Sequence, residues 1–265
     1  MSLGWARNRK PIATRPKVPK GEPQAGGFHW RMETARGPVH LWIPERYDAQ
    51  MAGVVVYLHG YYTTIDEAWK EHRLPEQFTA SGKNALFLAP EAPKGGNEEP
   101  FWDSLSALAD TAMRFFASTG QIIPQVPNVT VMGHSGAYRT IVGWLGDPIR
   151  HIVLLDALYG YERDFAQWID QAELTPDGEY DRQLTIVAWD TLRWSEPFVD
   201  LFADVVMVPR VPDRATAFDE NDRRARIFYM WSQYGHMEIV TEGRTIPILL
   251  TRTSLTNVRR ATRTR

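Results

Sequence analysis

Cysteine is absent from this chain of 265 residues. The sequence therefore offers no disulfide, no thiolate ligand for a metal and no cysteine nucleophile. It has no run of eighteen apolar residues, so we expect no membrane span. It also lacks a Gly-x-Gly-x-x-Gly turn after a strand, a phosphate-binding loop and a His-Glu-x-x-His pattern. These absences argue against dinucleotide, nucleotide and zinc chemistry, and we expect neither a metal nor an organic cofactor.

The opening residues, Met1 to Lys10, lack the apolar segment of a secretory signal. We expect a cytoplasmic protein for the chain as given, or a secreted one if a signal peptide was removed from a longer precursor. The length suits one large hydrophobic core. We expect a basic, proline-rich arm over residues 1–26, a main domain over residues 27–251 and a basic tail over residues 252–265.

Charge is unevenly distributed along the chain. Residues 1–20 hold six basic residues and no acid, and residues 252–265 hold five basic residues and no acid. Removing these eleven cations from the net charge of −2 leaves about −13 on the middle of the chain. The ordinary interpretation is two solvated tails on an acidic body. The alternative is that the basic arms dock on a partner subunit or an anionic polymer, as in a homo-oligomer. We expect no nucleic-acid partner.

Short apolar runs alternate with amphipathic stretches along the chain. Strands are predicted at 28–32, 39–43, 53–58, 84–90, 128–132, 151–156, 183–190 and 225–231, the first two as an antiparallel hairpin. Helices are predicted at 65–72, 103–117, 163–172, 197–205 and 237–250, with a loop over 207–222. The alternation predicts an α/β fold with a mainly parallel, twisted, eight-stranded sheet, helices on both faces and no large cap domain. Binding is expected at the carboxyl ends of the strands.

The stretch 128–139 carries the clearest chemical signal. An apolar run ends in Gly133-His134-Ser135-Gly136-Ala137, after which apolar residues recur at helical spacing. This pattern predicts a strand, a sharp turn and a helix. Small residues are needed two positions before and after the serine, because the turn presses them against the neighbouring strand and helix. The pattern fits a nucleophile elbow, with alanine in place of the last glycine.

A serine hydroxyl needs a base, and histidine is the usual one. Six of the seven histidines are set aside because they lie far from the turn, point away from the serine or are expected to shape the loop beside it: His29, His40, His59, His72, His134 and His151. His236 remains, on a short loop after the last strand. We expect His236 to be the base.

With these motifs the chain resembles the α/β-hydrolase superfamily from about Phe28 to Leu250. The resemblance rests on the His59-Gly60 turn, the elbow at Ser135 and the late His236. It implies that residues 27–251 form an α/β-hydrolase catalytic domain.

The resemblance also implies an acyl-transfer mechanism. Ser135 would attack a carbonyl, His236 would relay the proton, and water would release the acyl group. The backbone N–H groups of Gly136 and Tyr61 would form the oxyanion hole.

Two aspartates are candidates for the acid that orients His236. Asp190 follows the strand that most often carries the acid in the superfamily, whereas Asp156 directly follows the strand after the nucleophile's. Asp156 stands between apolar residues, so it needs a strong partner to stay ionised when buried. Asp190 is followed by Thr191 and Arg193, which could satisfy it without a catalytic role. We favour Asp156 and keep Asp190 as the alternative.

Aromatic residues cluster near the predicted opening of the site. We expect Tyr62, Trp102 and Tyr159 to bind the substrate in an open cleft, and Trp189 to pack in the core. The substrate would be a small-molecule or polymer-borne ester or amide. An esterase is favoured over a peptidase or amidase, although the fold hosts all three. The alternative function is a non-catalytic binding or structural subunit that keeps this fold and acts through its basic termini.

Overall fold

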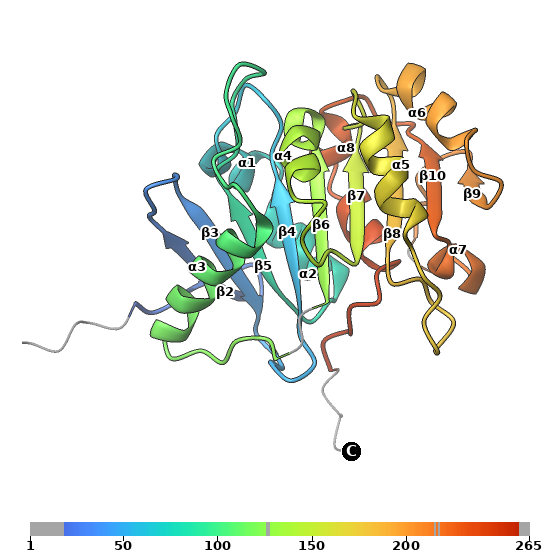
Figure 1. Cartoon of the computed structure of the whole chain (residues 1–265). Coiled ribbons are helices and arrows are strands. Elements are labelled where there is room, and N and C mark those ends of the chain that lie inside the picture. Colours follow the sequence, from blue (N-terminus) through green and yellow to red (C-terminus); the bar gives the residue numbers. More distant parts are fainter. Residues whose placement is uncertain (1–18, 126–127, 215, 217, 260–265) are drawn as a thin grey trace, which may run out of the picture.

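One sheet organises the computed structural model, which describes residues 19–259 apart from 126–127, 215 and 217. Its strands are β1 (Glu22–Gln24), β2 (Gly27–Met32), β3 (Val39–Pro44), β4 (Gly53–Leu58), β5 (Ala85–Pro90), β6 (Val129–His134), β7 (His151–Leu155), β8 (Gln183–Ala188), β9 (Val205–Val208) and β10 (Ile227–Trp231). Their spatial order is β1-β2-β3-β5-β4-β6-β7-β8-β10-β9 (Figure 1). The pairs from β1 to β5 are antiparallel, and the pairs from β5 to β9 are parallel. The predicted mainly parallel sheet is confirmed.

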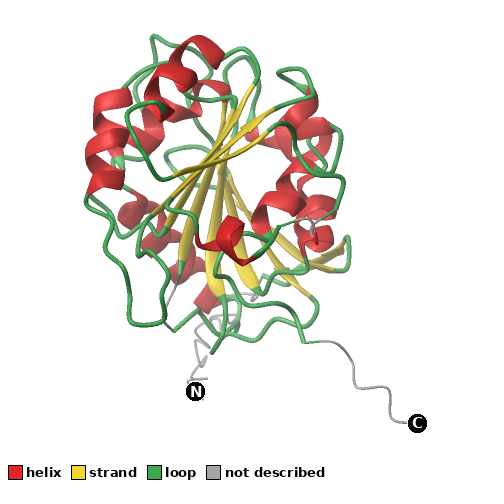
Figure 2. Ribbon diagram, turned by 90° about the vertical axis from the view of Figure 1, so that its right-hand side faces the viewer, coloured by secondary structure: helices red, strands yellow, loops and turns green. Residues whose placement is uncertain are grey.

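Helices cover both faces of the sheet, as the turned view in Figure 2 shows. They are α1 (Ile65–Glu71), α2 (Leu74–Ser81), α3 (Leu105–Ser118), α4 (Tyr138–Gly143), α5 (Glu162–Asp170), α6 (Leu192–Val199), α7 (Glu220–Arg224), α8 (Glu238–Thr241) and α9 (Thr245–Leu250). The helices α3, α4, α5 and α6 contribute apolar side chains to one core cluster, and α1, α2, α8 and α9 contribute to another. These two clusters lie on opposite faces of the sheet.

Strand β4 shows why a continuous apolar run forms a central strand. Its side chains alternate between the two clusters, with Val54 and Val56 in one and Val55 and Tyr57 in the other. A strand with helices on both sides has no solvent-facing side, so its sequence shows no polar alternation. The same arrangement surrounds β6, which carries Ser135 at its carboxyl end.

Helix α1 begins at a capping box. The side chain of Thr64 accepts a hydrogen bond from the backbone N–H of Glu67, and the side chain of Glu67 accepts one from the backbone N–H of Thr64. Such reciprocal bonds satisfy two of the free N–H groups at a helix start. The box fixes the direction in which α1 leaves the loop after β4.

The sheet has ten strands where the sequence predicts eight. All eight predicted strands are present, and the two additional ones are short edge strands. Strand β1 falls in the predicted irregular arm, and β9 falls where a helix end and a loop were predicted. Edge strands of three or four residues are stabilised by their neighbour rather than by a pattern of their own, so the sequence gives little indication of them.

Helix boundaries depart from the predictions at positions with left-handed backbone. Arg73 has φ 50° and separates α1 from α2, so the predicted helix at 65–72 is followed directly by a second one. Gly243 has φ 89° and divides the predicted helix at 237–250 into α8 and α9. Helix α6 begins at Leu192 rather than 197, and α7 begins inside the predicted loop at 207–222 and ends two residues beyond it.

The two predicted basic ends lie only partly within the described residues. Residues 1–18 and 260–265 are outside them. Residues 252–259 pack against the body: Arg252 is 2% exposed, and the backbone N–H of Val258 donates to the carbonyl of Gly82. The segment before residue 260 is therefore not a solvated tail. Among the helices in the described ranges, none combines the length and the apolar character needed to cross a bilayer.

Candidate active site

Ser135 occupies a strained turn at the end of β6. Its φ is 52°, a left-handed value that side-chain-bearing residues rarely adopt. A short 3₁₀ turn, Ser135–Ala137, leads from it into α4. A Cβ atom on Gly133 would lie 2.6 Å from Ile141 and 3.0 Å from the methyl group of Ala137. The glycine before the serine is therefore required by close packing, and the alanine after it fits against that glycine.

The loop after β4 approaches the serine closely. A Cβ atom on Gly60 would lie 2.8 Å from Cβ of Ser135, and one on Gly136 would lie 2.5 Å from the ring of Tyr61. Both contacts require glycine. They hold the backbone around Tyr61 and Gly136 beside the serine, where the sequence predicts the oxyanion hole.

His59 fixes the shape of this loop. Its Nδ1 lies 2.7 Å from the carbonyl oxygen of Gly60, and the backbone N–H of Ala92 donates to its Nε2 at 3.0 Å. A carbonyl only accepts and an N–H only donates, so the proton of a neutral imidazole is on Nδ1. Burial lowers the pKa of His59, which keeps this ring neutral.

His236 lies on the loop between β10 and α8 and is held by groups on both sides. The backbone N–H of Gly235 donates to Glu238 Oε2 at 3.0 Å, which fastens the loop to the start of α8. His134 Nε2 donates to the carbonyl oxygen of His236 at 3.0 Å. Burial lowers the pKa of His134 to about 3, with a further contribution from His236, so His134 serves as a neutral donor.

Asp156 is fully buried behind His236. Its Oδ2 lies 2.6 Å from His236 Nδ1. It also accepts bonds from the backbone N–H groups of Trp189, Asp190 and Thr191, and from the Thr191 hydroxyl. Burial alone would raise the pKa of this carboxyl, but the bonds from His236, Trp189 and Thr191 outweigh burial and lower it to about 2.

Asp190, the other predicted candidate for the acid, lies farther from the imidazole. Its Oδ2 is 3.9 Å from His236 Nδ1, and its side chain is 57% exposed. Ligand atoms of Asp156, Asp190 and His236 lie within 4.8 Å of one another and could together hold a metal ion. The carboxylate of Asp156 already accepts five hydrogen bonds, however, so few lone pairs remain for an ion.

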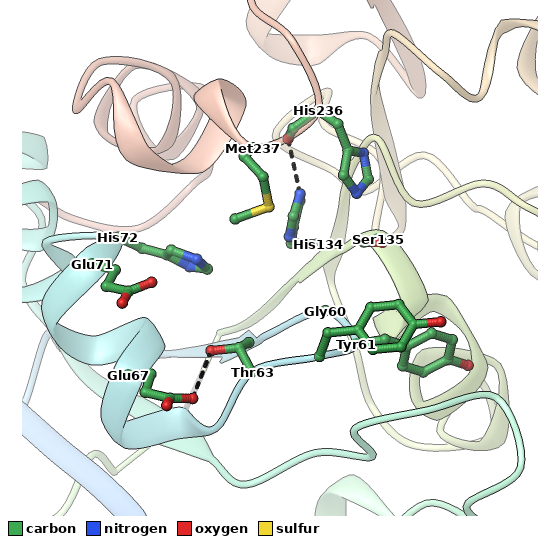
Figure 3. Close-up of a pocket in the computed structure, with 11 residues that line it drawn as sticks. Gly60, Tyr61, Thr63, Glu67, Glu71, His72, His134, Ser135, His236 and Met237 are labelled. Atoms are coloured by element: carbon green, nitrogen blue, oxygen red, sulfur yellow. Dashed lines mark hydrogen bonds between the residues drawn. The ribbon is translucent and has the colours of Figure 1, made fainter.

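A cavity of about 450 Å³ opens beside Ser135. Its lining residues come from the loop after β4, from α1, from the elbow and from the loop of His236: Gly60, Tyr61, Tyr62, Thr63, Glu67, Glu71, His72, His134, Ser135, His236 and Met237 (Figure 3). Figure 3 shows Ser135, His134 and His236 at one end of this group, and Glu67, Glu71 and His72 at the other. This volume can accommodate a small substrate.

The predicted substrate-binding aromatics have different positions. Tyr62 lines the cavity and is 94% exposed, and the Tyr159 hydroxyl lies 3.4 Å from His236 Nδ1. Trp102 is only 3% exposed and belongs to the core, so the expectation that it lines the site is not met. Trp189, expected in the core, is 45% exposed. A large aromatic side chain in a loop can turn inward or outward, and sequence position alone does not distinguish these cases.

Several cavity residues were not singled out by the sequence. Glu67, Glu71 and His72 all come from α1 or its end. Their spacing places the two glutamates on one helix face. The sequence gives no sign of which way that face points, because the direction of α1 depends on how it packs on the sheet.

Solved structures with a similar fold are serine hydrolases and esterases. A mutant of the feruloyl esterase module of Clostridium thermocellum complexed with sinapinate has a TM-score of 0.53 and 11% identity, covering 88% of this chain and 95% of that one. S-formylglutathione hydrolase of Staphylococcus aureus has a TM-score of 0.50 and 14% identity, covering 89% and 100%. A fluorophosphonate-binding serine hydrolase of Staphylococcus aureus has a TM-score of 0.50 and 12% identity, covering 89% and 100%. No protein-family model and no curated protein sequence matches the chain.

Proposed function

The chain has the α/β-hydrolase fold, and we propose that it is a serine hydrolase that cleaves a carboxylic ester or an amide. The observation that carries the proposal is the 2.6 Å bond between Asp156 Oδ2 and His236 Nδ1, on a histidine that shares a cavity with the strained Ser135. An ionised carboxylate on Nδ1 leaves Nε2 of the neutral imidazole without a proton. Nε2 can then act as a base.

In the proposed first step, His236 Nε2 takes the hydroxyl proton of Ser135 as Oγ attacks the carbonyl carbon of the substrate. The carbonyl oxygen becomes an anion, which the backbone N–H groups of Gly136 and Tyr61 stabilise. The intermediate then collapses. The bond to the leaving oxygen or nitrogen breaks, and that atom takes the proton from His236, which leaves an acyl-enzyme.

In the second half of the reaction, a water molecule gives a proton to His236 Nε2 and attacks the acyl carbon. Collapse of this intermediate returns the proton to Ser135 and releases the carboxylic acid. Asp156 stays ionised throughout and stabilises the imidazolium formed in each half. Its low pKa, about 2, suits this role. Ester cleavage is our first choice, because one of the similar structures is a feruloyl esterase module.

A fluorophosphonate probe tests the proposal directly, because it phosphonylates an activated serine. We expect mass spectrometry of the labelled protein to find the adduct on Ser135 and no adduct in a Ser135→Ala variant. Hydrolysis of p-nitrophenyl esters of graded chain length, measured beside peptide amides, would then identify the preferred bond. A folded sample that neither labels nor hydrolyses would contradict the proposal and favour a non-catalytic subunit acting through its basic termini.

A further inference from the structure

Glu91 is a buried carboxylate that takes no part in the proposed reaction steps. It follows β5 directly and is 5% exposed. Its Oε2 accepts a hydrogen bond of 2.9 Å from the backbone N–H of Ile65, the first residue of α1. That N–H is one of the groups that the start of a helix leaves without a partner in the helix itself. The bond therefore fixes the point at which the loop after β4 enters α1.

The other end of this loop is bonded to the residue next to Glu91. The backbone N–H of Ala92 donates to His59 Nε2 at 3.0 Å. Oε1 of Glu91 lies 3.8 Å from the same nitrogen. Residues 59–65 are thus held at both ends by two neighbouring residues, and the backbone N–H of Tyr61 lies between these ends.

The middle of the loop is bonded to the same stretch of chain. The backbone N–H of Tyr62, the residue after Tyr61, donates to the carbonyl of Lys94 at 2.9 Å. The side chain of Lys94 forms an ion pair with Glu91, in which Nζ lies 3.6 Å from Oε1. This pair favours the backbone conformation that brings the Lys94 carbonyl to Tyr62. The carboxylate of Glu91 therefore acts on the loop at its end and, through Lys94, at its middle.

The backbone of Glu91 is itself fixed by the turn between β2 and β3. Its N–H donates to the carbonyl of Pro38 at 2.9 Å. A Cβ atom on Gly37 would lie 2.7 Å from Cβ of Glu91, and Gly37 has φ 93°, a left-handed value that favours glycine. The turn therefore packs against the start of the Glu91 side chain and limits its movement.

One oxygen of this carboxylate is buried without a hydrogen bond. Among the described residues, Oε1 of Glu91 has no hydrogen-bond partner. Such buried polar atoms are rare in folded proteins, because leaving one unpaired costs free energy. The charge of Lys94 offsets part of this cost, and a neutral side chain at position 91 would avoid it altogether. The presence of a carboxylate here points to a role for its charge.

We propose that Glu91 is a positioning residue for the oxyanion hole, whose carboxylate holds the loop after β4 so that the Tyr61 N–H reaches the oxyanion formed at Ser135. The inference rests on the proposed serine hydrolase function and adds a residue to its machinery. The loop and the elbow are in close contact, since a Cβ atom on Gly60 would lie 2.8 Å from Cβ of Ser135 (Figure 3). A small displacement of the loop therefore changes the distance from the Tyr61 N–H to the oxyanion.

Two esters that differ only at the carbonyl atom test this role. In p-nitrophenyl acetate the negative charge develops on oxygen, whereas in O-(4-nitrophenyl) ethanethioate, with C=S in place of C=O, it develops on sulfur. Sulfur is a larger and weaker acceptor, so the donors of an oxyanion hole favour the oxygen ester. We expect Glu91→Gln to lower kcat/KM by about tenfold for the oxygen ester and by less than about twofold for the thionoester, because a displaced donor loses part of its contribution. Glutamine keeps an acceptor for the N–H of Ile65.

Asp147→Asn is the matched control. The carboxylate of Asp147 accepts a bond of 2.9 Å from the backbone N–H of Leu105, the first residue of α3. This change also neutralises a carboxylate that binds the start of a helix, so it shows the effect of altered stability alone, which thermal melts would measure. It should change both kcat/KM values by the same factor. If Glu91→Gln likewise changes both values by one factor, its role is only structural and the proposal is overturned.

Two further measurements keep the test decisive. If Glu91→Gln does not fold, Lys94→Met replaces it, because that side chain is 48% exposed. Lys94→Met should lower kcat/KM for the oxygen ester by about threefold and leave that for the thionoester unchanged, and an unchanged ratio would overturn the proposal. If thionoester turnover is too slow to measure, the affinity for a trifluoromethyl ketone, whose hemiketal carries an oxyanion, should fall about tenfold in Glu91→Gln and stay constant in Asp147→Asn.

The same measurements separate this role from the proposed catalysis. An unmodified protein that hydrolyses neither ester would remove the hydrolase function and the role of Glu91 together. An unmodified protein that hydrolyses the oxygen ester, with a Glu91→Gln variant that behaves like Asp147→Asn, would leave the hydrolase function in place and overturn the role of Glu91 alone.

Discussion

The backbone N–H of Asp190 donates a hydrogen bond of 3.1 Å to the carboxylate of Asp156. The two aspartates that compete for the role of triad acid are therefore joined, with one helping to hold the other. Asp156 has the shorter approach to His236 Nδ1, at 2.6 Å against 3.9 Å. The two residues therefore differ in role: the carboxylate of Asp156 orients His236, and the backbone N–H of Asp190 orients that carboxylate.

Replacing each aspartate by asparagine tests this division. We expect Asp156→Asn to lower kcat by about four orders of magnitude, because an amide facing Nδ1 favours the wrong imidazole tautomer. Asp190→Asn should lower kcat by less than about tenfold, since the change leaves the backbone N–H in place. Steady-state kinetics with one ester, accompanied by thermal melts to verify folding, would measure both. The opposite ranking would assign the acid role to Asp190.

Removing the nucleophile or the base should abolish turnover to a similar extent. Ser135→Ala and His236→Ala are each expected to reduce kcat by about six orders of magnitude, because the serine and its base act as a unit. The double variant should be no slower than either single variant. Active-site titration of each preparation would exclude contaminating activity. A double variant far slower than both single variants would mean that the two residues act independently.

Acid should destabilise the fold through three buried histidines. Burial is the main cause that lowers the pKa values of His40, His72 and His134, to about 4, 4 and 3. Their unfolded value is about 6.5. Between pH 6.5 and 4 the unfolded chain therefore binds more protons than the folded one, so the free energy of unfolding falls as the pH falls. Above pH 6.5 these histidines are neutral in both states, so they do not change the free energy of unfolding with pH.

Urea denaturation at several pH values would measure this loss. Each histidine contributes a slope of up to about 1.4 kcal/mol per pH unit in that window. Burial alone would raise the pKa of Asp156, but its hydrogen bonds lower it to about 2. The loss from Asp156 therefore comes below pH 4 and does not overlap the histidine window. In a His40→Asn variant the free energy of unfolding should fall less steeply with pH, by up to about 1.4 kcal/mol per pH unit, which is the contribution of one histidine. A free energy of unfolding that is constant from pH 7 to pH 4.5 would contradict this account.

Chain-local patterns predict the parts of the molecule that depend on neighbours in sequence. The elbow at Ser135 is visible because a strained turn demands small residues within two positions of it. Most of the eight longer strands are visible because strands buried on both faces need continuous apolar runs, whereas β2 alternates buried and exposed residues. His236 follows by elimination among seven histidines.

Features that depend on distant contacts are less visible in the sequence. Asp156 is held by three successive backbone N–H groups of residues 189–191, which reach it only once β7 and β8 pair. Trp102 is drawn into the core, although its place in a loop near the site suggested exposure. The spacing of Thr64 and Glu67 fits a capping box. That Glu67 also lines a cavity with Ser135 depends on where α1 packs in the fold, which the sequence does not indicate.

The contact between Gly136 and Tyr61 gives a test of the oxyanion hole that does not touch the triad. A methyl group at position 136 would lie 2.5 Å from the ring of Tyr61, so the ring, or the loop that carries it, must shift. We expect Gly136→Ala to lower kcat by about a hundredfold, because one displaced donor costs that much.

Truncating the ring should relieve this effect. Tyr61→Ala keeps the backbone N–H, so alone it should reduce kcat by less than about tenfold, and combined with Gly136→Ala it should restore most of the lost rate. The measurement is the full cycle of two single variants and the double variant with one neutral ester. If the double variant instead loses kcat by the product of the two single losses, the contact between Gly136 and the Tyr61 ring does not set the position of the Tyr61 N–H. The assignment of that N–H to the oxyanion hole would then fail.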